Sequence, residues 1–141
     1  MNPVTWQKWF EVGHETIDLE HRTFFTLVKK LEQQVAQGAP HDALQRTVSE
    51  LLKYADFHFT SEENVMLEYG FEGMDAHRAA HRRLLFKLRE DATSFQWGES
   101  SGSELVAFLY RWLVQHTIEE DAALAMVVKR ANMQRWFPDE G

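Results

Sequence analysis

Two pairs of residues with a spacing of four carry the clearest chemistry in this sequence. His58 and Glu62 form one pair, and His77 and His81 form the other. Residues four apart share one face of a helix, so each pair points in one direction if its segment is helical. A glycine-containing break at residues 69–73 separates the pairs. If this break is a turn, the two helices are antiparallel and the four side chains lie at similar heights, because a helix rises about 1.5 Å per residue. Three imidazoles and a carboxylate that converge in this way predict a metal site.

The composition fits one globular domain over residues 1–141. The chain is 44% hydrophobic and 26% charged, with a formal net charge of −7. An acidic balance argues against a nucleic-acid partner, which needs a basic face. The chain has no cysteine, so a thiolate zinc site, an iron–sulfur cluster and thiol catalysis are excluded. Any metal must therefore be bound by histidine, carboxylate or backbone groups.

The sequence carries no targeting or membrane signal. Its longest apolar run, from Leu105 to Tyr110, ends at Arg111 and is far shorter than the roughly 20 residues that span a bilayer. The first residues lack the charged and apolar regions of a signal peptide. We therefore expect a cytoplasmic protein without membrane insertion.

Apolar periodicity predicts an all-α fold. An aromatic arm over residues 1–16 precedes helices at about 17–37, 41–68, 74–95 and 103–131, and a tail follows at 132–141. Ser103 is the expected N-cap of the last helix. Four long helices with short connections predict an antiparallel up-down-up-down four-helix bundle with the arm packed on it.

The bundle adds three more ligands to the two pairs. His21 lies 18 residues before Ala39, and His58 lies 19 residues after it, so the two should be level. By the same reasoning, His116 and Asp121 on the fourth helix should be level with the histidine pair of the third. Candidate ligands from all four helices thus meet in one layer, and they are His21, His58, Glu62, His77, His81, His116 and Asp121.

A single histidine on an apolar stripe is usually a buried residue with a hydrogen-bonding neighbour. Five histidines and two carboxylates at one height do not fit that explanation, because unpaired buried carboxylates are costly. His14 and His41 fall outside the layer and are expected at the surface. Glu63, Glu119 and Glu120 are close to the ligands in sequence, but their angular positions favour solvent or the rim.

Seven ligands are too many for one ion, so a two-metal site is expected. Imidazole with carboxylate suits iron, manganese, zinc or copper. Two octahedral ions offer about 12 positions, and the histidines, two bridging carboxylates and a bridging oxide or hydroxide leave one open. A small ligand such as dioxygen fits that position. No nucleophile or general base suggests chemistry on a larger substrate.

These motifs resemble the hemerythrin family, in its bacterial form. The resemblance covers about residues 6–130 and rests on Ile17-Asp18-Leu19-Glu20-His21, His58-Phe59-Thr60-Ser61-Glu62-Glu63, His77 with His81, and Trp112-Leu113-Val114-Gln115-His116 with Asp121. It implies an assignment for every ligand. His77, His81 and His116 bind one iron, and His21 and His58 bind the other, which keeps the open position. Glu62 and Asp121 bridge the Fe²⁺ or Fe³⁺ ions together with an oxo or hydroxo group.

The resemblance also implies an oxygen pocket lined by Phe25, Leu113 and Thr117. The last position is usually isoleucine in this family, so the threonine is a departure. A hydroxyl there can hold a water or donate a hydrogen bond near bound oxygen. We expect faster autoxidation than in a Thr117→Ile variant, and equal half-lives of the oxygenated forms would contradict this.

Four functions remain open at this point. The first is reversible dioxygen binding for transport or storage, by a monomer without catalytic activity. The second is an oxygen or redox sensor that signals to a protein partner, which an exposed patch with Trp136 and Phe137 would favour. The third is a di-iron peroxidase or oxidase, and the fourth is a metal-storage or zinc protein.

Overall fold

The structure is a computed structural model that describes residues 11–116 and 121–136. Within these ranges every regular element is a helix, which confirms the all-α class. The helices are α1 (Glu15–Ala36), α2 (His41–Glu68), α3 (Met74–Gln96), α4 (Gly102–Gln115) and α5 (Ala122–Trp136). No helix among the described residues is both long and apolar enough to cross a bilayer.

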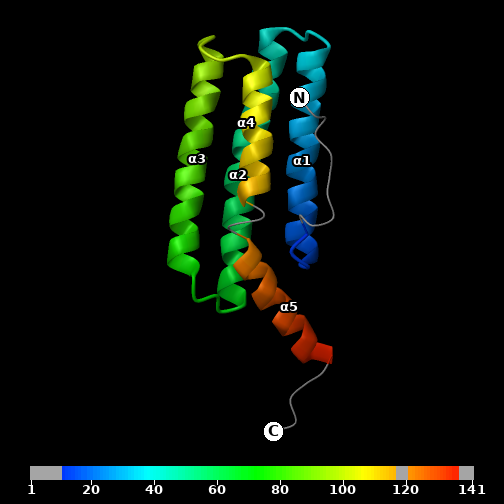
Figure 1. The fold of residues 1–141 in the computed structure, drawn as a ribbon, viewed down its shortest axis with the longest axis vertical. Coiled ribbons are helices and arrows are strands. Elements are labelled where there is room, and N and C mark those ends of the chain that lie inside the picture. The colour runs from blue at the N-terminus through cyan, green and yellow to red at the C-terminus, as the bar shows by residue number, and fades with distance from the viewer. Residues whose placement is uncertain (1–10, 117–120, 137–141) are drawn as a thin grey trace.

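Helices α1 to α4 lie side by side, and their connections alternate between the two ends of the group (Figure 1). Helix α1 packs against α2 and α4, and α3 packs against the same two helices. Helix α5 leaves this group at the end where α1 and α3 begin (Figure 1). The start of α1, the end of α2 and the start of α3 therefore lie at one end of the bundle, and α4 runs toward this end but stops short of it (Figure 1).

Glycines end α1, α2 and α3 with the same turn. Gly38 follows α1 with a φ of 70°, and Gly70 follows α2 with a φ of 65°. This left-handed conformation suits glycine because it has no Cβ. After α2, the backbone N–H of Phe71 donates to the carbonyl of Met66 at 2.9 Å, and that of Gly70 donates to the carbonyl of Leu67 at 3.2 Å. The turn at Gly70 reverses the chain between the His58–Glu62 pair and the His77–His81 pair.

Two apolar clusters fill the interior. The main core runs between α1, α2, α3 and α4 and includes Phe24, Leu51, Phe59, Leu88 and Leu109. A smaller end cluster lies where α5 meets the other helices and consists of Val12, Ile17, Val65, Met66, Leu124 and Val128. Helix α5 thus covers the end of the bundle with two buried side chains.

The polar layer lies between the two clusters. On α1, His21 stands between Ile17 of the end cluster and Phe24 of the main core. On α2, Glu62 stands between Phe59 of the main core and Val65 of the end cluster. The predicted ligands are therefore enclosed by apolar side chains on both sides along the bundle.

The start of α1 differs from the expected residue 17. The helix begins at Glu15, and the ring of His14 accepts a hydrogen bond from the backbone N–H of Ile17 at 3.4 Å. The Asp18 carboxylate accepts from the backbone N–H groups of Val12 at 2.7 Å and Gly13 at 3.1 Å. Asp18 therefore fixes the segment that enters α1. Residues 1–10 of the predicted arm lie outside the described residues.

The prediction of one helix over residues 103–131 is wrong. Helix α4 ends at Gln115, Asp121 is a bend, and α5 begins at Ala122. The backbone N–H of Asp121 donates to the carbonyl of His116 at 3.1 Å, a span of five residues that is wider than the four of an α-helix. The two predicted ligands His116 and Asp121 thus lie on either side of the break between α4 and α5.

The two ends of this segment also differ from the prediction. The N-cap of α4 is Ser101, whose side chain accepts from the backbone N–H of Glu104, and not Ser103. Helix α5 continues to Trp136, into the range predicted as a tail. Phe137 and the rest of the predicted tail lie outside the described residues.

Candidate metal centre

The structure brings all seven predicted ligands together in one buried layer. His21 comes from α1, and His58 and Glu62 come from α2. His77 and His81 come from α3, His116 follows α4, and Asp121 precedes α5. Each of these side chains is at most 5% exposed. The spacing of the residues along antiparallel helices therefore gave the correct heights.

The seven residues form two overlapping groups. The two-histidine group consists of His21, His58, Glu62 and Asp121. The three-histidine group consists of Glu62, His77, His81, His116 and Asp121. Within each group one ligand atom from every residue lies within 4.8 Å of the others. Only the two carboxylates belong to both groups.

Glu62 directs one oxygen toward each group. Its Oε1 lies 2.6 Å from His77 Nε2 and 3.1 Å from His81 Nε2. Its Oε2 is closest to His58 Nε2, at 3.2 Å, and lies 3.8 Å from both His21 Nε2 and His116 Nε2. A carboxylate divided in this way has the geometry of a bridge between two cations.

Asp121 is divided in the same way. Its Oδ1 lies 3.2 Å from His77 Nε2 and 3.4 Å from His116 Nε2. Its Oδ2 lies 3.2 Å from His21 Nε2. The bend before α5 places this short side chain at the layer, whereas Glu62 reaches it from inside a regular helix.

Several of these buried atoms have no hydrogen-bond partner in the described part of the chain. They are His21 Nδ1, Glu62 Oε2, both ring nitrogens of His116 and both carboxylate oxygens of Asp121. Buried polar atoms of this kind are rare. Metal coordination would satisfy those that face the cluster, which are Glu62 Oε2, His116 Nε2 and both Asp121 oxygens, but not the Nδ1 atoms of His21 and His116. The set of five imidazoles and two carboxylates therefore fits a pair of divalent metal ions, of which iron, manganese and zinc are suitable members.

The electrostatics show how strongly the cluster attracts positive charge. Burial lowers the pKa of His21, but the Asp121 and Glu62 carboxylates outweigh burial and raise this pKa to about 10. Burial also lowers the pKa of His77, and the same two carboxylates outweigh burial and raise this pKa to about 10. Burial raises the pKa of Glu62, yet the surrounding histidines, His116 first among them, hold it well below its usual value. Without metal, protons on the rings compensate the carboxylates.

Aromatic rings line the main-core side of the layer. The ring of Phe59 stacks on His81 at a centroid distance of 4.2 Å, and Trp112 stacks on His116 at 5.8 Å. The predicted oxygen-pocket residues Phe25 and Leu113 are both buried in the main core. Thr117 lies outside the described residues, as do Glu119 and Glu120.

Two further carboxylates among the described residues contact predicted ligands and were not predicted from the sequence. Glu20 is buried and its Oε1 lies 2.8 Å from His58 Nδ1. Glu63 was expected at the rim, but its Oε2 lies 3.1 Å from His81 Nδ1. The one available signal was the position of each glutamate directly beside a predicted ligand.

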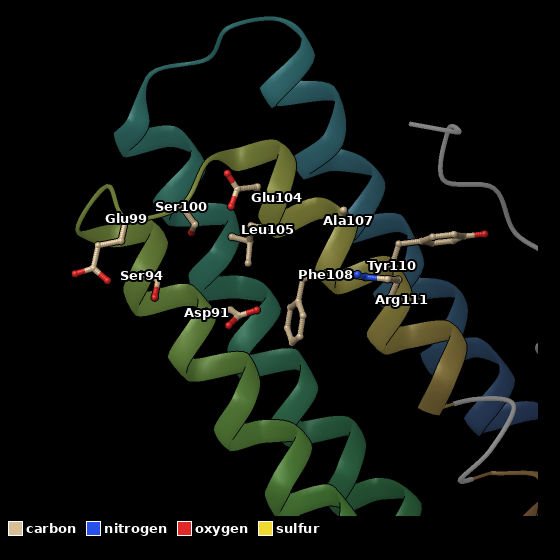
Figure 2. A pocket seen from close by; sticks show the side chains of 10 residues that line it. All are labelled: Asp91, Ser94, Glu99, Ser100, Glu104, Leu105, Ala107, Phe108, Tyr110 and Arg111. Atoms are coloured by element: carbon tan, nitrogen blue, oxygen red, sulfur yellow. The ribbon is translucent and has the colours of Figure 1, made fainter.

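A cavity of about 700 Å³ lies elsewhere, near the connection between α3 and α4 (Figure 2). Asp91, Glu99 and Glu104 are among its lining residues, and none of the seven ligands is. Its residues belong to the end of α3, the connection that follows and α4 as far as Arg111, whereas His77 and His81 lie near the start of α3 and His116 follows α4. The cavity is therefore not part of the candidate centre.

Comparisons with known proteins give one consistent result. The model of the hemerythrin HHE cation binding domain matches residues 12–128. The bacteriohemerythrin of Pseudomonas aeruginosa is 30% identical over 131 residues, which cover 93% of this chain and 85% of that protein. The bacteriohemerythrin of Stenotrophomonas maltophilia is 32% identical over 127 residues, which cover 89% and 82%. A crystal structure of wild-type hemerythrin superposes with a TM-score of 0.78 at 28% identity and covers 88% of this chain and 96% of its own.

Proposed function

Because the chain belongs to the hemerythrin family, we propose that its buried cluster holds two iron ions and binds dioxygen reversibly, for transport or storage. The observation that carries this proposal is the division of Glu62 and Asp121 between the two histidine groups. A site for one ion needs no such division. Two carboxylates that each direct one oxygen to either side support two neighbouring metal positions.

The proposal assigns the ligands unequally. His77, His81 and His116 hold one iron, and His21 and His58 hold the other. Glu62 and Asp121 would bridge the pair together with an oxo or hydroxo group. The two-histidine group would hold its iron with one protein ligand fewer, which would leave room for dioxygen there. When bound, the two irons supply the electrons for reversible oxygen binding.

The chain itself orients the ligands and excludes water. The main core and the end cluster enclose the layer on both sides. Phe25 and Leu113 contribute buried apolar surface to the main core, and with Thr117 they form the proposed oxygen pocket. A dry pocket favours reversible binding because it limits proton entry and side reactions.

Metal analysis combined with an oxygenation cycle tests the function. We expect about two irons per chain and a visible charge-transfer band that appears with oxygen and disappears when oxygen is removed from the reduced protein. Two irons that oxidise once and do not recover would contradict a carrier. Rapid turnover of hydrogen peroxide would instead indicate a peroxidase, whereas the proposal includes no catalytic residue.

A second candidate is an oxygen sensor, and the position of Asp121 favours it. This proposed ligand directly precedes α5, and its carbonyl accepts from the backbone N–H of Ala125 in that helix at 2.9 Å. Movement of Asp121 would therefore reach α5 directly. Hydrogen exchange of α5 in the reduced and oxygenated proteins separates the two functions, since a sensor requires a change there and a carrier does not.

The remaining parts of the proposal concern the chain as a whole. We propose a single domain of residues 1–141 with up-down-up-down topology and an N-terminal arm, acting as a cytoplasmic monomer. The alternating connections of α1 to α4 support the topology (Figure 1). Gel filtration coupled to light scattering tests the oligomeric state.

A further inference from the structure

Two of the five cluster histidines have a carboxylate at the ring nitrogen that faces away from the cluster. The Nε2 atom of His58 faces Glu62, and its Nδ1 lies 2.8 Å from Glu20 Oε1. The Nε2 atom of His81 also faces Glu62, and its Nδ1 lies 3.1 Å from Glu63 Oε2. By contrast, the Nδ1 atoms of His21 and His116 have no hydrogen-bond partner among the described residues.

Each of the two outer carboxylates is held by a further contact. Glu20 is 6% exposed, and the Ser61 hydroxyl donates to its Oε2 at 2.5 Å. The Tyr54 hydroxyl donates to the backbone carbonyl of Glu20 at 3.1 Å. The guanidinium of Arg78 donates to Glu63 Oε1 at 2.8 Å. Both glutamates are therefore fixed before any metal binds.

A carboxylate at Nδ1 has two consequences for a histidine ligand. The ring donates its Nδ1–H to the carboxylate, so the lone pair is on Nε2 and points into the cluster. The negative charge also makes the ring a better electron donor to a metal, and loss of such a partner typically weakens metal binding by about 10–100-fold.

We propose that Glu20 and Glu63 are positioning residues, and that each serves one of the two ions. Glu20 acts through His58 on the ion of the two-histidine group, and Glu63 acts through His81 on the ion of the three-histidine group. This inference rests on the proposed function, because it requires that both rings bind metal. It assigns a specific role to two carboxylates that do not touch the ions.

The two variants Glu20→Gln and Glu63→Gln test the inference. Glutamine keeps the size and a hydrogen-bond acceptor but removes the charge. We expect each variant to bind one Co²⁺ ion as the wild type does and the other about 10–100-fold more weakly. The double variant should bind both ions weakly. Anaerobic Co²⁺ titration of the apo-protein, followed by visible absorption with a competing chelator, measures both constants.

Two further variants separate positioning from a general effect of charge or folding. Glu68→Gln removes an exposed carboxylate at the end of α2 and should leave both constants unchanged. Glu20→Ala removes the acceptor as well as the charge and should weaken the same ion more than Glu20→Gln does. Urea unfolding of the apo-proteins reports any change in the fold itself, which would not be confined to one ion.

Each result has a distinct meaning. If the wild type binds two ions and both glutamine variants bind them equally tightly, the positioning inference is wrong and the proposed di-metal site stands. Weakening of both ions by either single variant also overturns it, because the assignment of one glutamate to one ion then fails. If the wild type binds fewer than two ions, the proposed function fails together with the inference.

Discussion

Metal binding to the apo-protein should release protons, and the affinity should rise with pH. Asp121 and Glu62 outweigh the effect of burial and raise the pKa values of His21 and His77 to about 10. Both rings are therefore in the doubly protonated, positively charged form at neutral pH in the apo-protein. A ring nitrogen that binds a metal ion cannot keep its proton.

The structure sets a lower limit on the number of protons that each ion releases when it binds. His21 belongs to the two-histidine group and His77 to the three-histidine group. Each ion must therefore displace at least one proton. Below the raised pKa values, the affinity for each ion should increase about tenfold per pH unit, and the product of the two constants about 100-fold.

Calorimetry measures the number of protons directly. Zn²⁺ suits the titration because it has no redox chemistry, and the observed enthalpy in buffers of different ionisation enthalpy gives the protons released per ion. A His41→Gln variant is the matched control, because His41 is exposed and belongs to neither group. Release of less than one proton per ion, or affinities that do not change with pH, would refute the assignment of the raised pKa values.

The stability of the apo-protein should fall as the pH rises, in contrast to the metal affinity. A histidine whose folded pKa is raised stabilises the fold below its ordinary value of 6.5, and this stabilisation is lost as the pH rises through the folded value. The melting temperature of the apo-protein should therefore fall between pH 6.5 and about 10, while metal affinity rises. Metal-loaded protein should lack this decline, since its rings hold metal in place of protons.

Two predictions concern the helices that position the site. Ser101→Ala should lower the free energy of unfolding by about 1 kcal/mol through loss of the α4 N-cap, whereas Ser103→Ala should not, and urea denaturation measures both. Leu124→Ala, at a fully buried position of the end cluster, should cost about 2–5 kcal/mol. Met126→Ala, on the exposed side of α5, should have little effect, and equal losses in the two α5 variants would contradict the described packing.

The heights of the ligands could be predicted from the sequence because regular helices convert residue counts into distances. His21, His58, His77 and His81 all lie within uninterrupted helices, so counting from the turns placed them correctly. The turn at Gly70 was also visible as a glycine break. These features depend only on local sequence and on constant helix geometry.

The break before Asp121 could not be predicted in the same way. Apolar positions such as Leu113 and Leu124 fit one helical period on both sides of it, so periodicity gives no sign of a change in direction. The hydrogen bond from Asp121 to the carbonyl of His116 spans five residues, and such wide turns are common at functional sites. The break brings the predicted ligands His116 and Asp121 to the same layer, and this depends on packing against the other helices. The apolar pattern of the sequence does not predict it.

The contacts of Glu20 and Glu63 escaped prediction for a related reason. Glu20 precedes His21 on α1 but contacts His58 on α2. Glu63 follows Glu62 on α2 but contacts His81 on α3. A residue that flanks the inward stripe looks solvent-exposed when one helix is considered alone. Its actual partner depends on how far the neighbouring ring reaches, which only the packed structure shows.

His116 should stabilise the fold when metal is absent, because it faces both of the shared carboxylates. Its side chain is 1% exposed, and its Nε2 lies 3.4 Å from Asp121 Oδ1 and 3.8 Å from Glu62 Oε2. The rings of Phe59 and Trp112 lie 5.3 and 5.8 Å from it, so leucine would meet apolar neighbours but would leave both carboxylates with one imidazole fewer to compensate them. Leaving a buried polar group without one of its partners costs about 1–3 kcal/mol, and His116→Leu should lower the unfolding free energy of the apo-protein by an amount in this range.

The loss caused by this variant should be larger once metal is added. The three-histidine group would retain two imidazoles, so one ion should bind weakly while the wild type gains stability in proportion to the logarithm of metal concentration. Urea denaturation with and without Zn²⁺ should therefore show a larger difference between the two proteins with the metal than without it. If the apo-variant is the more stable protein, His116 does not compensate the carboxylates in the metal-free fold, and if the difference does not grow with Zn²⁺, His116 does not bind the metal.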